Sequence, residues 1–302
     1  MRIAVTGASG FVGGAAATAL AERGHDVTGF GRTPRGWRHP QGIYEVWDLA
    51  TGPRHGEFDV VVHSAALADD WAPLSEAMLA NQLGTRTVVS SFPGARIVHL
   101  STSSVYDAFT PSIKIQESAA PVSRFLSSYS ESKTAAEAEL VGLDAVILRP
   151  HAVYGPGDTT LLPRILDGIR GGRLTLPEGA EVSHTLTHID NLVHAIELAL
   201  TGPAGIYNIG DDTDVLLSAV LREFLDRRGR ADVAIAGIPY AVAYAAATAI
   251  ETAHRLTRRG RPRLTRYAVS QLGLERTLDL TAARTGLDYF PGPTTFAGAE
   301  NW

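Results

Sequence analysis

A glycine-rich turn follows the first apolar run of the chain, and it constrains the fold more than any other feature. Residues 2–5 are strand-like, and glycines at Gly7, Gly10 and Gly13 then precede an Ala- and Leu-rich helical stretch. In such a turn the first glycine permits the tight bend, the second lets the backbone approach a pyrophosphate, and the third lets helix pack closely on strand. The helix N-terminus would face the phosphate charge. The segment predicts a dinucleotide site, with a merely structural turn as the alternative.

Strand-like apolar runs alternate with helical patterns through the first half of the chain. The runs cover residues 3–5, 27–30, 59–63, 95–100 and 145–148. This alternation is typical of an α/β protein with a doubly wound parallel sheet. A chain of 302 residues can form one large domain with a smaller satellite. We therefore expect a Rossmann-type domain over 1–155, with 184–215 returning to it, and a smaller, mostly helical substrate-binding region over 156–183 and 216–302.

The end of the second predicted strand bears on the choice of dinucleotide. Enzymes of this fold that prefer NAD place a carboxylate there for the ribose 2′-hydroxyl, whereas those that prefer NADP place an arginine nearby for the 2′-phosphate. Here the position holds Gly31, Arg32 follows it, and Asp26 lies at the opposite end of the strand. The sequence therefore favours NADP(H) over NAD(H), and the alternative is that Arg32 is a solvated loop residue.

Composition excludes several classes of function. The chain is 45% hydrophobic with a formal net charge of -5, as expected for an ordinary soluble protein without the basic character that binds nucleic acid. It contains no cysteine, which excludes disulfides, thiolate metal sites and cysteine nucleophiles. No His, Asp and Glu grouping has metal-ligand spacing, so no metal site is expected. The N-terminal segment lacks a signal-peptide pattern, and a cytoplasmic location is expected.

Tyr129 and Lys133 form a predicted proton-transfer pair. Residues four apart share one face of a helix. A nearby ammonium favours the phenolate, so Lys133 is expected to lower the Tyr129 pKa from about 10 toward the working range of a general base. A tyrosine with a lysine at this spacing is more often a solvated helix face, so the pair depends on its context.

Seven ordered segments supply that context and resemble the extended short-chain dehydrogenases/reductases of the NAD-dependent epimerase/dehydratase superfamily. They are the turn at 6–13, the Asp-Leu step at 47–49, the strand end at 62–66, the N-x-x-G-T helix at 81–85, the Ser/Thr-rich segment at 101–106, the Y-x-x-S-K helix at 129–133 and the R-P-x-x-V-Y-G-P-G segment at 148–157. Further segments resemble the 3β-hydroxysteroid dehydrogenase and sterol-4-carboxylate dehydrogenase branch. They lie at 149–163, 187–195, 238–240, 264–267 and 281–289.

The resemblance implies a set of site residues. Tyr129 would be the general acid/base for hydride transfer between nicotinamide and a carbinol carbon. Thr102, with Ser103 as the fallback, would bind the substrate oxygen, Lys133 would also hold the nicotinamide ribose, and Asn81 would support the site. The implied cofactor contacts are Gly7, Gly10, Phe11, Val12, Gly13, Arg32, Asp48, Leu49, Ala65, Ala66, Tyr129, Lys133, Pro150 and Val153. The implied substrate contacts are Ser103, Ser104, His151 and Tyr154.

Departures from the superfamily pattern guide the choice of substrate. Nucleotide-sugar members usually carry an arginine where this chain has His184, and 4,6-dehydratases carry an Asp-Glu pair where it has Ser103 and Ser104. Asp107 replaces a usual glycine beside the substrate loop. We expect an NADP(H)-dependent oxidoreductase for a hydrophobic secondary alcohol or ketone, 3-hydroxysteroid-like or 3-keto-acid-like. The alternatives are a nucleotide-sugar epimerase or reductase and a non-catalytic dinucleotide sensor.

Two segments of the C-terminal half also carry predictions. Residues 233–250 hold no charge, but their alanine content, Gly237 and Pro239 favour a packed helix over a membrane span, and 238–250 is expected to form one wall of an apolar substrate pocket. Segment 254–267 holds six arginines and no acid, which suits an anionic membrane surface or substrate group, or else a solvated helix end. The expected partners are a small hydrophobic substrate and, by the resemblance, a second copy in a homodimer.

Overall fold

The computed structural model describes residues 1–257 and 260–302, and its centre is a parallel sheet of seven strands. The strands lie in the order β12, β7, β5, β4, β1, β2, β3. Their bounds are β1 (Arg2–Thr6), β2 (Asp26–Gly31), β3 (Gly42–Val46), β4 (Val60–His63), β5 (Arg96–Leu100), β7 (Ala145–Pro150) and β12 (Gly205–Ile209). The chain starts in the middle at β1, continues outward through β2 and β3, and then crosses back to β4. This is the doubly wound fold predicted from the sequence.

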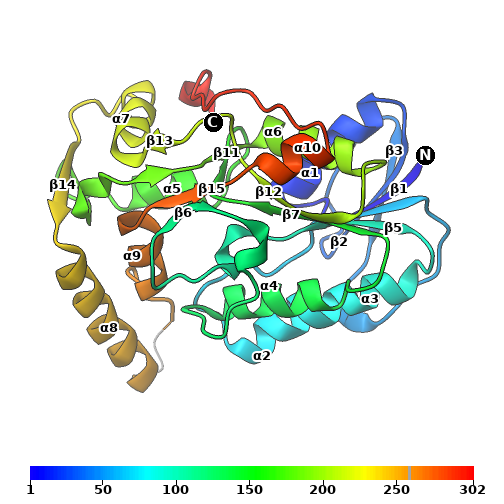
Figure 1. Cartoon of the computed structure of the whole chain (residues 1–302), viewed down its shortest axis with the longest axis horizontal. Helices are drawn as coiled ribbons and strands as arrows, with labels where there is room; N and C mark the ends of the chain where they lie inside the picture. Colours follow the sequence, from blue (N-terminus) through cyan, green and yellow to red (C-terminus); the bar gives the residue numbers. More distant parts are fainter. Residues whose placement is uncertain (258–259) are drawn as a thin grey trace.

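Helices cover both faces of this sheet (Figure 1). One face carries α1 (Phe11–Glu22) and α6 (Ile189–Ala199), which pack against each other. The opposite face carries α3 (Gly84–Ser91) and α4 (Ser128–Ala138). The short helix α2 (Leu74–Ala77) runs through a π-helical segment, Met78–Leu83, directly into α3.

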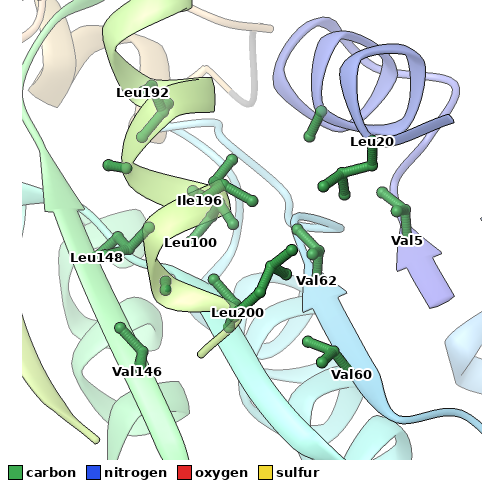
Figure 2. Close-up of a cluster of buried hydrophobic side chains, with 14 of the residues drawn as sticks. Val5, Leu20, Val60, Val62, Leu100, Val146, Leu148, Leu192, Ile196 and Leu200 are labelled. Carbon is green, nitrogen blue, oxygen red and sulfur yellow. The ribbon is translucent and has the colours of Figure 1, made fainter. Parts of the chain in front are cut away.

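Alternating side chains of each strand build two cores because parallel strands are buried on both faces. In β7, Val146 and Leu148 belong to the core beneath α1 and α6, whereas Ala145 and Ile147 belong to the core on the α3 face. Figure 2 shows the first of these cores, where strand residues meet helix residues. The labelled side chains are Val5, Val60, Val62, Leu100, Val146 and Leu148 with Leu20, Leu192, Ile196 and Leu200.

Smaller sheets and further helices form the rest of the molecule. β9 (Arg173–Pro177) pairs with β14 (Ala234–Ile238), and β8 (Val153–Tyr154) pairs with β11 (Thr187–His188). A four-stranded sheet has the order β13 (Val215–Leu216), β10 (Ser183–His184), β15 (Arg276–Leu278), β6 (Ser112–Ile115). The helices are α5 (Leu161–Asp167), α7 (Leu217–Arg227), α8 (Tyr240–Leu256), α9 (Arg266–Gly273) and α10 (Thr281–Gly286).

Two elements cross the expected domain boundaries. β6 lies within 1–155 but pairs with β15 in the smaller sheet. Conversely, α10 contacts β12, and Ala283, Leu287 and Tyr289 enter the core of the large sheet beneath α1 and α6. The chain therefore returns to its first layer near the C-terminus as well as over 184–215.

Helix α8 lies along one edge of the molecule beside α9 (Figure 1). Ala243 and Ala247 of α8 pack on Val269 of α9. Within residues 1–257 and 260–302, no helix has both the length and the apolar character needed to cross a bilayer.

Candidate active site

A cleft of about 1660 Å³ opens at the carboxyl edge of the large sheet. We call it the active-site cleft. Its lining includes the segments that follow β1, β4, β5 and β7, helix α5, residues 261–265 before α9, and residues 267–268 and 271–272 of α9. In open α/β sheets, ligands bind where neighbouring strands are followed by chain running in opposite directions. Here that point lies between β1 and β4, where residues 6–13 and 64–68 line the cleft.

The turn after β1 has the geometry of a pyrophosphate cradle. Gly7 has φ +73°, and a Cβ there would lie 2.7 Å from the Ala65 backbone nitrogen. A Cβ on Gly13 would lie 2.3 Å from the Gly7 oxygen, so neither position accepts a side chain. In the described structure no side chain caps α1 at Gly10, which leaves backbone N–H groups facing the cleft. These residues fit the diphosphate of a dinucleotide.

The far end of the cleft combines Gly31, Arg32, Asp48 and Leu49. Arg32 is exposed. The Asp48 carboxylate accepts the Ala50 N–H at 3.0 Å and caps the short turn Leu49–Thr51. Ser9 also lines this end, and a Cβ on Gly31 would lie 2.7 Å from its hydroxyl oxygen. Sequence reasoning missed Ser9, although it stands inside the glycine-rich turn.

Tyr129 and Thr102 meet in the cleft from different elements. Thr102 follows β5, and Tyr129 is in the first turn of α4, which Ser127 caps by accepting the Ser130 N–H at 3.1 Å. Burial raises the pKa of Tyr129, and a hydrogen bond with the Thr102 hydroxyl opposes that rise. Tyr129 and Thr102 thus bring a protonated phenol and a second hydroxyl into one cleft, and both groups can donate a hydrogen bond to a carbonyl oxygen.

Lys133 lies beneath the cleft and does not line it. Its ammonium donates to the Leu100 carbonyl at 2.8 Å and to His99 Nε2 at 3.0 Å. Burial lowers the Lys133 pKa to about 8 and holds the His99 pKa well below its ordinary value, so His99 accepts this bond as a neutral ring. The expected lowering of the Tyr129 pKa by Lys133 is absent from the structure, because the lysine binds β5 and desolvation dominates at the phenol.

Asn81 is buried in the π-helical segment and connects two parts of the site. Its side-chain oxygen accepts the Leu67 N–H at 2.7 Å, and its nitrogen donates to the Ser132 hydroxyl at 2.8 Å. Ser132 lies between Tyr129 and Lys133 on α4, so Asn81 connects the loop after β4 to α4.

The structure separates the predicted contacts into two groups. The cleft is lined by Gly7, Gly10, Phe11, Val12, Gly13, Arg32, Asp48, Leu49, Ala65, Ala66, Thr102, Ser104, Tyr129, Pro150, His151 and Val153. Asn81, Ser103, Lys133 and Tyr154 lie behind that surface. Ser103 bonds to His151 Nδ1 at 2.9 Å. Tyr154 is fully buried and donates to Asp211 at 2.9 Å. The prediction that Tyr154 contacts the substrate is therefore wrong for this structure.

The C-terminal wall of the cleft differs from the prediction. None of the residues 238–250 lines the cleft; residues 261–265, 267–268 and 271–272 do, because α9 lies between α8 and the cleft. The arginine-rich segment is part of this wall. Arg261 pairs with Asp69 and Asp70, and Arg263 also lines the cleft. Arg258 and Arg259 of that segment lie outside the described residues.

Tyr267 of α9 is a cleft residue to which the sequence assigned no role. Its hydroxyl lies 2.6 Å from the Ser104 hydroxyl, which in turn accepts from Thr102 at 3.1 Å. The sequence signal was weak, since Tyr267 is only one position in the resemblance at 264–267.

Comparison with known proteins agrees with this geometry. The NAD dependent epimerase/dehydratase family model matches residues 3–210. The 4-hydroxy-2-methyl-3-oxo-4-farnesyl-3,4-dihydroquinoline-1-oxide ketoreductase of Stigmatella aurantiaca is 33% identical, over 96% of this chain and 92% of its own. A 2-alkyl-3-oxoalkanoate reductase of Shewanella oneidensis is 31% identical, over 94% and 81%. The UDP-glucuronic acid 4-epimerase of Bacillus cereus, solved with NAD, shares the fold, with a TM-score of 0.73 at 20% identity over 99% and 96%.

The predicted fold and superfamily are thus confirmed, and the glycine turn, Tyr129 and Thr102 line one cleft. The chain belongs to the NAD dependent epimerase/dehydratase family and is a nicotinamide-dinucleotide oxidoreductase of the extended short-chain dehydrogenase/reductase type, on the branch that includes 3-beta-hydroxysteroid dehydrogenases.

Proposed function

We propose that the protein is an NADP(H)-dependent reductase of hydrophobic ketones, with Tyr129 as the proton donor. The observation that carries the proposal is that the hydroxyl residues Tyr129 and Thr102 line the same cleft as the glycine-rich turn. The bound nicotinamide would supply the hydride. Thr102 would donate a hydrogen bond to the carbonyl oxygen, and Tyr129 would transfer a proton to it as the alcohol forms.

The electrostatics of the site agree with Tyr129 as a proton donor. Burial raises the pKa of Tyr129, so the phenol stays protonated at neutral pH and can act as an acid. Lys133, whose pKa is about 8, lies one helical turn further along α4 and can return a proton toward the site after turnover. Its ammonium has a third N–H beside those given to the Leu100 carbonyl and His99, and this donor would serve the proposed second role of holding the nicotinamide ribose.

The substrate side of the cleft supports an apolar ligand. Its lining includes Leu161, Ile165, Leu174, Leu176, Leu264 and Leu272. An apolar chain buried there would gain roughly 25 cal/mol per Å² removed from water. The names of the two reductases describe ketones that carry an apolar chain and a second oxygen substituent near the carbonyl. We assign the same substrate class to this protein.

The preference for NADP(H) is supported at the adenosine end of the cleft. Gly31 leaves the strand end without a carboxylate, and Arg32 and Ser9 line the cleft beside it. These donors suit a 2′-phosphate. By contrast, His184, at the position where nucleotide-sugar enzymes carry arginine, is buried and 3.2 Å from His151, so it offers no contact for a sugar nucleotide. A cytoplasmic homodimer remains part of the proposal by family resemblance.

The test is NADPH oxidation with long-chain ketones and 3-oxo esters, compared with UDP-sugars. Tyr129→Phe should lower kcat/KM for the ketones by about 10²- to 10⁴-fold and leave the NADPH dissociation constant unchanged, because only the acidic oxygen is removed. Tyr207→Phe is the matched control, since the Tyr207 hydroxyl bonds to the Pro203 carbonyl outside the cleft. Turnover of a UDP-sugar with no reduction of any ketone would refute the proposal.

A further inference from the structure

We propose that Tyr267 is a second substrate-binding phenol, and that it recognises the carbonyl oxygen of an ester, acid or thioester one carbon removed from the ketone that is reduced. The substrate class is thus a 3-oxoacyl compound. This inference rests on the proposed ketone reductase function and deepens it.

A row of four hydroxyl groups carries the inference. Tyr129 and Thr102 line the cleft together, Thr102 donates to Ser104 at 3.1 Å, and the Ser104 and Tyr267 hydroxyls are 2.6 Å apart. All four residues line the active-site cleft. The proposed mechanism uses only the first two. Ser104 and Tyr267 extend the row beyond Thr102, and Tyr267 lies on the same wall of the cleft as the apolar residues Leu264 and Leu272.

Tyr267 reaches this row from a distant element. It stands 163 positions after Ser104 and belongs to the side of α9 that also places Ala268, Gln271 and Leu272 in the cleft. The Ser104 hydroxyl already accepts a hydrogen bond from Thr102, so it has a partner without the Tyr267 phenol. A phenol has one donor and two acceptor sites, and Ser104 takes only part of that capacity.

The hydrogen-bonding sites of Tyr267 that Ser104 does not use favour a substrate with a second oxygen. A purely apolar ligand would keep water away from the donor or acceptor sites of the phenol that Ser104 does not use, which costs binding free energy. A ligand oxygen at this place restores the bond. Tyr129 and Thr102 hold the ketone oxygen, and Tyr267 lies beyond Ser104, one hydroxyl further along the row. Two oxygens of one 1,3-dicarbonyl unit match two contact points separated in this way.

A pair of matched ketones tests the inference. Ethyl 3-oxododecanoate has both oxygens, 3-dodecanone has only the ketone, and neither carries a charge that the cleft arginines could bind. Tyr267→Phe should lower kcat/KM for the ester by about 10-fold, as expected for the loss of one well-placed hydrogen bond. It should change kcat/KM for 3-dodecanone by no more than about twofold and leave the NADPH dissociation constant unchanged. Tyr207→Phe should change neither substrate.

Ser104→Ala provides a second variant that keeps the phenol but removes its anchor. Because Ser104 also accepts from Thr102, this variant should lower kcat/KM for both ketones and lower it further for the ester. Melting curves of both variants establish that they are folded. Equal losses for the two ketones, or no loss for the ester, would overturn the inference and leave the reductase proposal standing. A wild-type enzyme that reduces neither ketone would overturn the proposed function and this inference together.

Discussion

At the scale of single residues, the proposed preference for NADP(H) depends on the charge of Arg32 at the end of the cleft. Arg32→Ala should weaken NADPH binding by about 1.5 to 3 kcal/mol, because charge-assisted hydrogen bonds to a phosphate contribute on that order. NADH has no 2′-phosphate, and its affinity should stay the same. Calorimetric titration of both dinucleotides measures the difference. Arg35→Ala is the control, since Arg35 is exposed and does not line the cleft. Equal losses for NADPH and NADH would refute this role.

Lys133 gives a residue-scale prediction about pH. Its pKa falls from 10.5 to about 8 on folding because burial disfavours the ammonium. Between these values the unfolded chain binds more protons than the folded protein, so the free energy of unfolding rises with pH through that window. Wild type should therefore gain stability relative to Lys133→Met from pH 8 to pH 10.5, measured by urea unfolding. Other groups titrate in both proteins and cancel. A stability difference that stays constant over this range contradicts the prediction.

At the scale of elements, α9 forms the cleft wall that the sequence analysis expected from residues 238–250. Leu272 of α9 lines the cleft, so Leu272→Gln should raise KM for a long-chain ketone and leave NADPH binding intact. Ala243 of α8 is 1% exposed against α9, so Ala243→Gln should instead cost about 1 to 3 kcal/mol of stability by overpacking. Val242→Gln, on the exposed side of α8, is the control for both measurements. Steady-state kinetics and thermal melts separate these outcomes, and a raised KM in a stable Ala243→Gln protein would restore α8 as the pocket wall.

At the scale of the whole molecule, four buried histidines link folding to pH. Burial lowers the pKa of His63 to about 3 and that of His184 to about 4, and it holds His99 and His151 well below their ordinary value. The unfolded chain would protonate them near pH 6.5. Below that pH the unfolded state binds more protons, so stability is lost as pH falls.

Urea unfolding between pH 6.5 and 4.5 should show this loss before most carboxylates titrate. His63→Asn should reduce the slope, because asparagine can still bond to Thr6, the partner of His63 Nδ1, without taking up a proton. His39→Asn is the matched control, since His39 lies near the surface and not in the core. Parallel slopes for wild type and His63→Asn would exclude His63 as a contributor.

The sequence by itself determined those features of the fold and the site that depend on residues close together in the chain. The turn at Gly7, Gly10 and Gly13 needs only a strand, a bend and a helix in succession, and alternating apolar residues define a strand buried on both faces. The spacing of Tyr129 and Lys133 places both on one side of a helix. These are local rules, and the structure has the fold that they predict.

Contacts between distant segments were decided only in three dimensions. Whether Lys133 meets Tyr129 or the Leu100 carbonyl depends on how α4 packs against β5, and the burial that raises the Tyr129 pKa is a property of the assembled cleft. The pairing of β6 with β15 and the bond between Ser104 and Tyr267 join segments more than 160 positions apart. No periodic pattern encodes such partners, because side-chain spacing reports which face of an element is buried but not which other element buries it.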